Sequence, residues 1–143
     1  MTKVGNIFSL FYATVNGSAL TLELVVDKKG IVKDKHYNKS TERSVLISSL
    51  ESYALAEKHG IAVPYGVLGE NLLIDYNPYH LKTGARLKIA NVILEISQHC
   101  TLCKSFTKID TRLPNLLKDD RGIFAKVIKS GCITEGDDIY LLD

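Results

Sequence analysis

The sequence predicts a mainly β protein, an antiparallel β-barrel that is closed or strongly curved and carries a few short helices. Many short segments alternate apolar and polar residues, turns that contain glycine separate them, and one segment has clear helical spacing. The chain has 143 residues, of which 45% are hydrophobic and 24% charged, which suits one globular domain. We therefore expect residues 1–143 to form a single domain.

The first elements are predicted to form a β-hairpin. Residues 7–15 are rich in aromatic and β-branched side chains, and residues 20–26 show the alternation of a half-buried strand. Between them lies Asn16-Gly17, the dipeptide that most strongly favours a tight hairpin turn. We expect the two segments to pair across this turn.

One helix is predicted after a short strand at residues 45–47. Ser48 and Glu51 have the spacing of a capping box, and helical spacing continues until Gly60 ends it. Residues 101–120 have weaker helical spacing, which Pro114 interrupts. The remaining predicted strands share period-two alternation or β-branched composition and cover residues 72–76, 85–89, 92–96, 123–127 and 139–142.

The charge pattern excludes some classes of partner. Eighteen basic against sixteen acidic residues give a formal net charge of +2, too balanced for non-specific nucleic-acid binding. Residues 27–43 are locally basic, which suits either a solvated turn or a small phosphorylated ligand. No apolar run has the length of a membrane span, and the N-terminus lacks the pattern of a signal peptide, so we expect no membrane partner and a cytoplasmic location.

The three cysteines are expected to be reduced thiols, because their odd number and spacing do not indicate a disulfide framework. Cys100 and Cys103 form a C-x-x-C pair, but the helix that a thioredoxin-type site needs is poorly predicted after it. His99 next to this pair allows a zinc site that still lacks a fourth ligand. Spacing alone leaves chemistry and simple packing both open.

Other polar residues are candidates for binding a small ligand. Asp34 and His36 would lie on one side of an extended segment and could hold an oxyanion together with neighbouring basic residues. Glu70 could accept a hydrogen bond from Arg43 or from a ligand, and a solvated loop or a strand start is the alternative in each case. No Walker loop, GxGxxG, GxSxG or HExxH motif occurs. The candidate binding residues are Lys33, Asp34, His36, Arg43, Glu70, Asn71 and Arg121.

Taken in order, these segments resemble the MOSC domain, the family named after the C-terminal part of molybdenum cofactor sulfurase. The resemblance covers about residues 5–142. The matching segments are GIVKDKH at 30–36, RSVLI at 43–47, GENL at 69–72, Cys103-Lys104 and RGIFAKV at 121–127. The sequence departs from the family pattern at Lys33, where the family has a glycine, and at Lys35, where it has an arginine.

The resemblance implies a β-barrel similar to that of pyruvate kinase, and a role with the molybdenum cofactor (molybdopterin). Cys103 is the cysteine that the resemblance assigns, either to ligate molybdenum or to carry sulfur as a persulfide. Some family members reduce N-hydroxylated compounds. Lys33, Lys35 and Arg121 would neutralise the pterin phosphate, and Asp34 or Asn71 would bond the pterin edge.

The chain has no room for the pyridoxal-phosphate domain that generates a persulfide in larger relatives, so sulfur would come from a partner protein. A redox partner is the corresponding expectation for a reductase. The alternative function is a non-catalytic β-barrel module that binds a phosphorylated ligand or a protein partner, and a zinc-stabilised interaction domain is the third. Neither the substrate nor the oligomeric state follows from the sequence.

Overall fold

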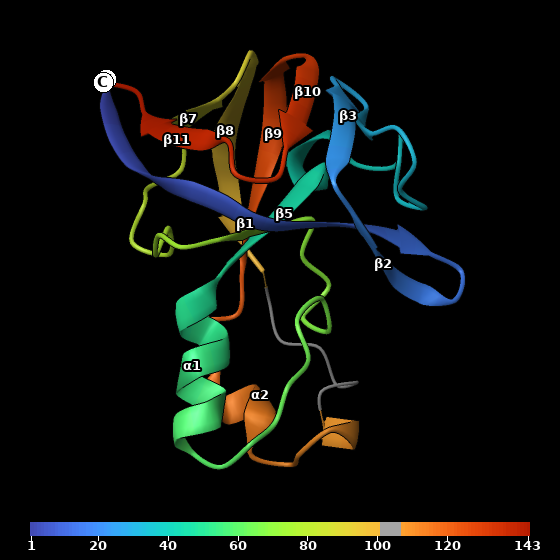
Figure 1. The fold of residues 1–143 in the computed structure, drawn as a ribbon, viewed down its shortest axis with the longest axis vertical. Coiled ribbons are helices and arrows are strands. Elements are labelled where there is room, and N and C mark those ends of the chain that lie inside the picture. Colours follow the sequence, from blue (N-terminus) through green and yellow to red (C-terminus); the bar gives the residue numbers. More distant parts are fainter. Residues whose placement is uncertain (101–106) are drawn as a thin grey trace.

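A computed structural model describes residues 1–100 and 107–143 of the chain. Seven of the described strands close into a barrel in the order β11–β7–β8–β9–β5–β6–β1, and β1 pairs back with β11. The barrel forms the upper part of the molecule in Figure 1. Its strands are β1 (Thr2–Thr14), β5 (Val45–Ser49), β6 (Leu72–Ile74), β7 (Arg86–Ile89), β8 (Val92–His99), β9 (Ile123–Lys129) and β11 (Asp138–Leu141).

The barrel is mixed, so the prediction of a purely antiparallel barrel is only partly right. β5 and β6 run parallel, with Ile47 opposite Leu72, whereas the other described barrel pairs are antiparallel. The reason lies in the connection, because helix α1 (Leu50–Lys58) follows β5 directly and carries the chain across before β6 begins. Parallel neighbours need such a crossover, whereas a hairpin turn can only join antiparallel strands.

The predicted hairpin at Asn16-Gly17 is confirmed, but its second strand is interrupted. β2 (Gly17–Thr21) pairs with the second half of β1, and the expected strand over residues 20–26 divides at Leu22. After this break, β3 (Glu23–Asp27) joins a separate three-stranded sheet with β4 (Gly30–Ile31) and β10 (Gly131–Thr134). The alternating pattern is continuous in sequence, and the change of sheet therefore depends on tertiary pairing with β10.

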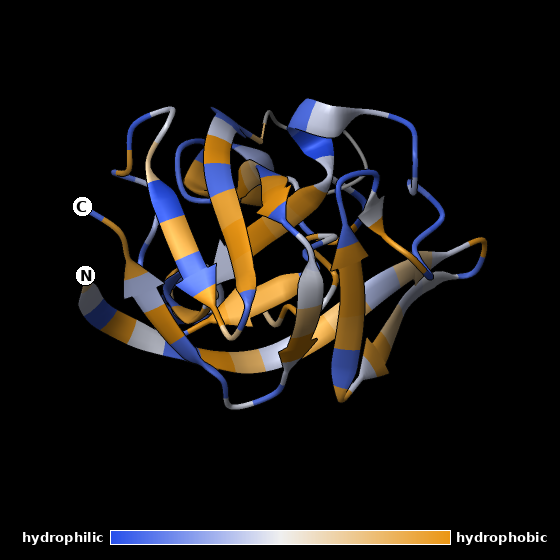
Figure 2. Ribbon diagram, turned by 90° about the horizontal axis from the view of Figure 1, so that it is seen from above, coloured by the Kyte–Doolittle hydropathy of each residue, from blue (hydrophilic) through white to orange (hydrophobic). Residues whose placement is uncertain are grey.

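Alternation along the strands divides the apolar residues between two clusters. Leu72 and Ile74 of β6 point into the barrel core, whereas Leu73 between them packs beneath the helices. Figure 2 shows the corresponding bands of hydrophobic and hydrophilic residues along several strands. The barrel core also includes Ile7, Leu10, Val45, Ile47, Leu87, Ile89, Leu94, Ile96, Ile123, Ala125, Val127 and Ile139.

The helices cover one end of the barrel, as Figure 1 shows. The predicted helix is confirmed as α1, but its N-cap is Ser49 rather than Ser48, and the Ser49 side chain accepts a hydrogen bond from the Glu51 N–H. Pro114 lies in the first turn of the short helix α2 (Leu113–Leu116), where proline is tolerated. The second apolar cluster includes Tyr53 and Leu73 and joins α1, α2 and β6.

The chain between β4 and β5 is fastened to the outside of the barrel. It includes the 3₁₀ turn η1 (Thr41–Arg43), where the Glu42 carbonyl accepts a hydrogen bond from the Ser97 hydroxyl of β8 and the Glu42 carboxylate lies 3.7 Å from the Lys126 ammonium.

Among the described helices, none is long and apolar enough to cross a bilayer.

Candidate functional site

Asp34 lies at the centre of a hydrogen-bond group between β1 and the loop after β4. Its Oδ2 accepts from the Ala13 N–H at 2.7 Å and from the Asn71 side-chain amide at 2.9 Å. Its Oδ1 accepts from the His36 N–H at 2.8 Å and lies 2.9 Å from His36 Nδ1. Asp34 and His36 therefore contact each other, but the predicted extended segment is wrong, because residues 32–39 form turns that bring the two side chains together. Both carboxylate oxygens of Asp34 are engaged within the protein.

Asn71 connects this group to the barrel. Its Oδ1 accepts a hydrogen bond from the Leu46 N–H at 3.0 Å, and its Nδ2 also donates to the Phe11 carbonyl at 3.2 Å. The Asn71 backbone pairs with the same two residues, Leu46 and Phe11. Asn71 therefore links β1, β5 and the Asp34 loop, which gives the residue a structural role besides any contact with a ligand.

Glu70 points into a different environment from that of its neighbour Asn71. The residue is 1% exposed, and its Oε2 accepts a 2.6 Å hydrogen bond from the Tyr53 hydroxyl of α1. Tyr53, and not the expected Arg43, donates this hydrogen bond, because the Glu70 side chain points towards α1. The other oxygen, Oε1, has no hydrogen-bond partner among the described residues. Burial raises the pKa of Glu70, and the Tyr53 hydrogen bond and the Arg121 charge oppose that effect.

Tyr53 was not predicted as a site residue, because its place in the helical pattern is that of a core residue. Its hydroxyl accepts hydrogen bonds from the Gly66 N–H at 3.0 Å and the Leu68 N–H at 3.4 Å while it donates to Glu70. Burial raises the pKa of Tyr53, and the Glu70 charge adds to that effect. A buried tyrosine hydroxyl normally needs a hydrogen-bond partner. A tyrosine on the buried face of the predicted helix could therefore have indicated a polar partner beneath that helix.

A second buried polar group lies at the start of α1. The Tyr79 hydroxyl accepts from the Ser49 N–H at 2.8 Å and lies 2.6 Å from the Ser52 hydroxyl. Ser52 also donates to the Asp120 carbonyl. Burial raises the pKa of Tyr79 to about 12, so the phenol stays protonated at neutral pH. This group fastens α1 to the chain before Arg121 and was not predicted.

Arg121 and Gly122 form the corner at which β8 ends. The Gly122 carbonyl accepts from the Cys100 N–H at 3.0 Å, and Arg121 Nη2 donates to the Leu68 carbonyl at 3.4 Å. A Cβ atom at Gly122 would lie 3.0 Å from Leu46 Cδ1, so the glycine allows the close packing of this corner. The buried Cys100 is the last residue described before position 107.

The other basic candidates lie apart from Glu70. The Lys33 ammonium is 5.8 Å from the centre of the Tyr12 ring, and the Arg43 guanidinium is 4.8 Å from the centre of the Phe124 ring. In the described part of the chain, neither forms an ion pair with Glu70. Hydrogen bonds join Asp34, His36 and Asn71 in one group. Glu70 belongs to another, where the Arg121 charge lowers its pKa against the effect of burial.

The predicted reactive cysteine, Cys103, lies outside the described residues. Within residues 1–100 and 107–143, no group of three potential ligands could hold a metal ion, and the zinc alternative that includes Cys103 is not tested by them. Cys132 is exposed on β10, with its Sγ 3.7 Å from a Glu23 carboxylate oxygen. Desolvation and then the Glu23 charge raise the pKa of Cys132, which disfavours a reactive thiolate there.

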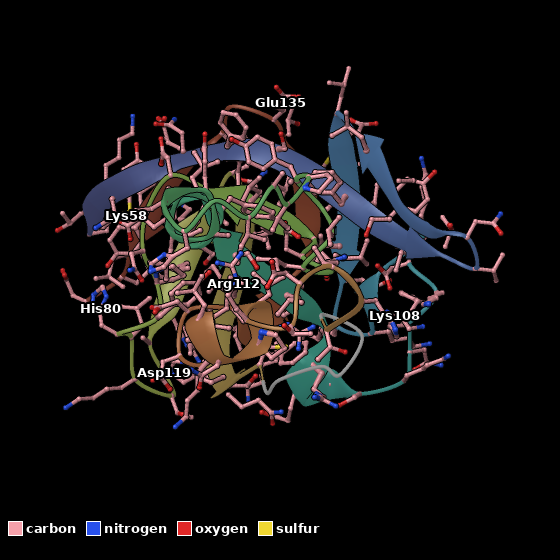
Figure 3. All side chains as sticks on the ribbon, turned by 90° about the horizontal axis from the view of Figure 1, so that it is seen from below. Lys58, His80, Lys108, Arg112, Asp119 and Glu135 are labelled. Atoms are coloured by element: carbon pink, nitrogen blue, oxygen red, sulfur yellow. The ribbon has the colours of Figure 1, made fainter. Side chains whose placement is uncertain are left out.

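A cleft of about 620 Å³ lies along α1, and none of the predicted binding residues lines it. Its walls are mostly apolar and include Tyr53 and Tyr65, whose rings pack edge to face at 5.0 Å. In the view of Figure 3, Lys58, His80, Lys108 and Asp119 lie around the rim of the molecule. Arg112 lies nearer the centre of that view and pairs with Asp110 at 2.9 Å.

Glu70→Gln is expected to change how the free energy of unfolding depends on pH. Because the folded protein holds the Glu70 proton more tightly than the unfolded chain, wild-type stability is expected to fall as pH rises above the ordinary value of 4.5 towards the raised folded pKa. Each pKa unit of difference corresponds to about 1.4 kcal/mol. Urea unfolding at several pH values should show a wild-type stability that declines relative to the variant. A constant difference across the range from pH 4.5 to 8 would contradict the raised pKa.

Comparisons with known proteins agree with this architecture. A family model described as MOSC domain matches residues 33–140. No curated protein sequence matches the chain significantly.

Three solved structures of bacterial proteins have a similar fold. The YUAD protein from Bacillus subtilis is 19% identical, with a TM-score of 0.80 over 95% of this chain and 94% of that chain. YiiM from Geobacillus stearothermophilus is 17% identical, with a TM-score of 0.78 over 97% of this chain and 75% of that one. YiiM from Escherichia coli is 16% identical, with a TM-score of 0.72 over 100% and 70%. At these identities the likeness concerns the fold.

Proposed function

The chain belongs to the MOSC domain family, and from this membership we propose that it binds the molybdenum cofactor through the Cys103 thiolate. The family is associated with molybdenum cofactor-related proteins. Cys103 lies inside the segment that the family model matches, in the Cys-Lys context that the family resemblance singles out. The family match over residues 33–140 is the observation that carries the proposal.

The chemistry of the cysteine supports this role. Molybdenum in a sulfur-rich cofactor is a soft metal for which a thiolate is a suitable ligand, and the thiolate is also the form of cysteine that accepts sulfane sulfur. The other two cysteines suit the role less, since Cys100 is buried at the end of β8 and a carboxylate adjoins Cys132. When bound, the cofactor would supply two-electron redox chemistry, which fits the reduction of N-hydroxylated compounds.

The donor set of the described residues fits the cofactor in part. Arg121 and Lys33 supply positive charge for the pterin phosphate, and Glu70 Oε1 is a buried polar atom without a hydrogen-bond partner in the described part of the chain. Asp34 and Asn71 already use their polar atoms within the protein, so any contact of theirs with the pterin edge would add to existing hydrogen bonds. We therefore assign the phosphate to the basic residues and structural support to Asp34 and Asn71.

Elemental analysis and mass spectrometry of the freshly purified protein test the proposal. Protein made in a host that synthesises the cofactor should contain molybdenum and a pterin. A mass increase of one sulfur atom on Cys103 without a metal would instead identify a sulfur carrier, supplied by a sulfur-donor protein. Protein free of metal, pterin and sulfur adduct would favour a binding module for a phosphorylated ligand, and zinc would indicate the interaction domain.

Lys33→Glu is expected to weaken binding of the pterin phosphate. The Lys33 side chain is exposed and lies against the Tyr12 ring, in a loop where a positive charge attracts an anion. We expect a loss of about threefold to tenfold in affinity at low salt and a smaller loss at high salt, because salt screens exposed charges. Titration of the cofactor into apoprotein at two ionic strengths measures this effect.

Lys129→Glu is the matched control for this substitution. Lys129 is also exposed, and it lies at the end of β9 opposite Ile93 of β8. The control should bind like the wild type. Equal affinity in all three proteins would contradict a role for Lys33.

A further inference from the structure

The cleft along α1 combines mostly apolar walls with a single charged group. Its volume of about 620 Å³ has the size that is usual for small-molecule sites. One wall is a face of α1, and the other is formed by residues 61–65, which Figure 1 shows turning back from the end of α1 towards the barrel. Among the described residues that line the cleft, Glu57 alone carries a charge.

Two aromatic rings of the cleft belong to a row of three. Tyr65 packs edge to face against Tyr53 at 5.0 Å and against Phe8 of β1 at 5.5 Å. The Tyr53 hydroxyl is engaged inside the protein with Glu70 and two backbone N–H groups, so Tyr53 offers its ring to the cleft. Tyr65 is 51% exposed and Phe8 is 43% exposed. Neighbouring rings that stay this exposed are typical of a binding surface.

Glu57 gives the cleft its charge. The residue is exposed and lies one helical turn after Tyr53, so both side chains lie on the same face of α1. Within residues 1–100 and 107–143, Glu57 forms no ion pair. The next residue, Lys58, does not line the cleft. A cation that enters the cleft therefore meets a carboxylate that no described basic side chain neutralises.

Backbone carbonyl groups of the opposite wall are further hydrogen-bond acceptors. Residues 61–64 belong to no helix or strand, and the Ala62 and Val63 carbonyls accept no hydrogen bond from a described residue. An ammonium ion has three N–H donors and no acceptor, so it matches a carboxylate and open carbonyl groups. An anionic ligand of the same size would instead be repelled by Glu57.

We propose that this cleft binds an organic ammonium ion with an aromatic body. The body lies against the Tyr53 and Tyr65 rings, and the ammonium group lies at Glu57. Burial of the body removes apolar surface from water, the rings attract the positive charge, and the carboxylate selects a cation over a neutral or anionic group. The site is separate from the proposed cofactor site, because none of the residues assigned to the cofactor lines the cleft.

NMR titration of the full chain with phenethylamine and with phenethyl alcohol tests the proposal. In ¹H–¹⁵N spectra, the amine should shift the backbone signals of Ala54, Ala62 and Tyr65 in a saturable way. A ligand of this size should bind with a dissociation constant on the order of 1 mM. The alcohol has the same body without the charge and should bind about twofold to fivefold more weakly. Signals that do not move, or equal binding of amine and alcohol, would overturn the proposal.

Glu57→Gln separates the charge from the apolar walls. This variant should bind the amine about twofold to fivefold more weakly at low salt, with a smaller loss at high salt and no change for the alcohol. Glu51→Gln is the matched control, because Glu51 is exposed on the same helix but does not line the cleft. The control should bind both ligands like the wild type. An equal loss of amine affinity in the two variants would overturn the assignment of Glu57.

Tyr65→Ala tests the aromatic wall. Because the body of either ligand loses its contact with the ring, both should bind about fivefold to tenfold more weakly. The Tyr65 ring is half exposed, and an unchanged melting temperature would show that the fold is kept. Affinity that this substitution leaves unchanged would overturn the proposal. Shifts of the Ala54 and Ala62 signals when the protein alone is diluted would identify a second copy of the chain as the occupant and would also overturn it.

Discussion

Replacing Cys103 with serine is expected to remove molybdenum and pterin from the purified protein, or any sulfane sulfur, while the barrel remains folded. Serine retains the size of cysteine but offers a hydroxyl, which is neither a soft metal ligand nor an acceptor of sulfane sulfur. We expect the molybdenum content to fall by at least about tenfold. Mutation of a residue that only supports a metal ligand already lowers metal affinity by about 10–100-fold, and Cys103 would be the ligand itself. Elemental analysis and the mass of the intact protein measure the change.

Cys132→Ser is the matched control for this prediction. Cys132 is exposed on β10, and the Glu23 carboxylate adjoins its thiol. This variant should retain the cofactor at the wild-type level. Circular dichroism should give the same spectrum for both variants and the wild type, which separates loss of the ligand from loss of the fold. Equal molybdenum in Cys103→Ser and in the wild type would refute the role of Cys103.

The fold was predictable from the sequence where a signal is local. Asn16-Gly17 specifies a hairpin turn by its backbone preferences, and the helix that ends before Gly60 begins at a serine cap. The parallel pairing of β5 with β6 was not predictable in this way, because it depends on where α1 delivers the chain. The division of residues 20–26 at Leu22 is likewise set by β10, which lies more than 100 residues later.

The residues of the candidate site could be predicted from their types, but most of their hydrogen-bond partners could not. Asp34 and His36 are two residues apart, so their contact follows from local geometry, and the structure confirms it. Glu70 and Tyr53 are brought together by the packing of α1 on the barrel end, and their hydrogen bond joins residues 17 positions apart. Residue type indicated that Glu70 needs a donor, whereas only the tertiary structure identifies that donor as Tyr53.

Asn71→Ala is expected to lower the free energy of unfolding by about 3 kcal/mol or more. The substitution removes the acceptor of the Leu46 N–H and the amide that donates to Phe11 and Asp34, and all of these groups lie in a buried region. Each buried polar group that loses its partner costs about 1–3 kcal/mol. Urea unfolding can be followed by tyrosine fluorescence, because the chain has seven tyrosines and no tryptophan.

Asn91→Ala is the control for this effect, since Asn91 is exposed in the turn between β7 and β8 and should change the stability by less than about 0.5 kcal/mol. A loss below 1 kcal/mol in Asn71→Ala would mean that water replaces the side chain. Asp34→Ala combined with Asn71→Ala gives a sharper test. Because the two side chains share a 2.9 Å hydrogen bond, their effects should be non-additive by about 0.5–3 kcal/mol, whereas additive losses would contradict the coupling.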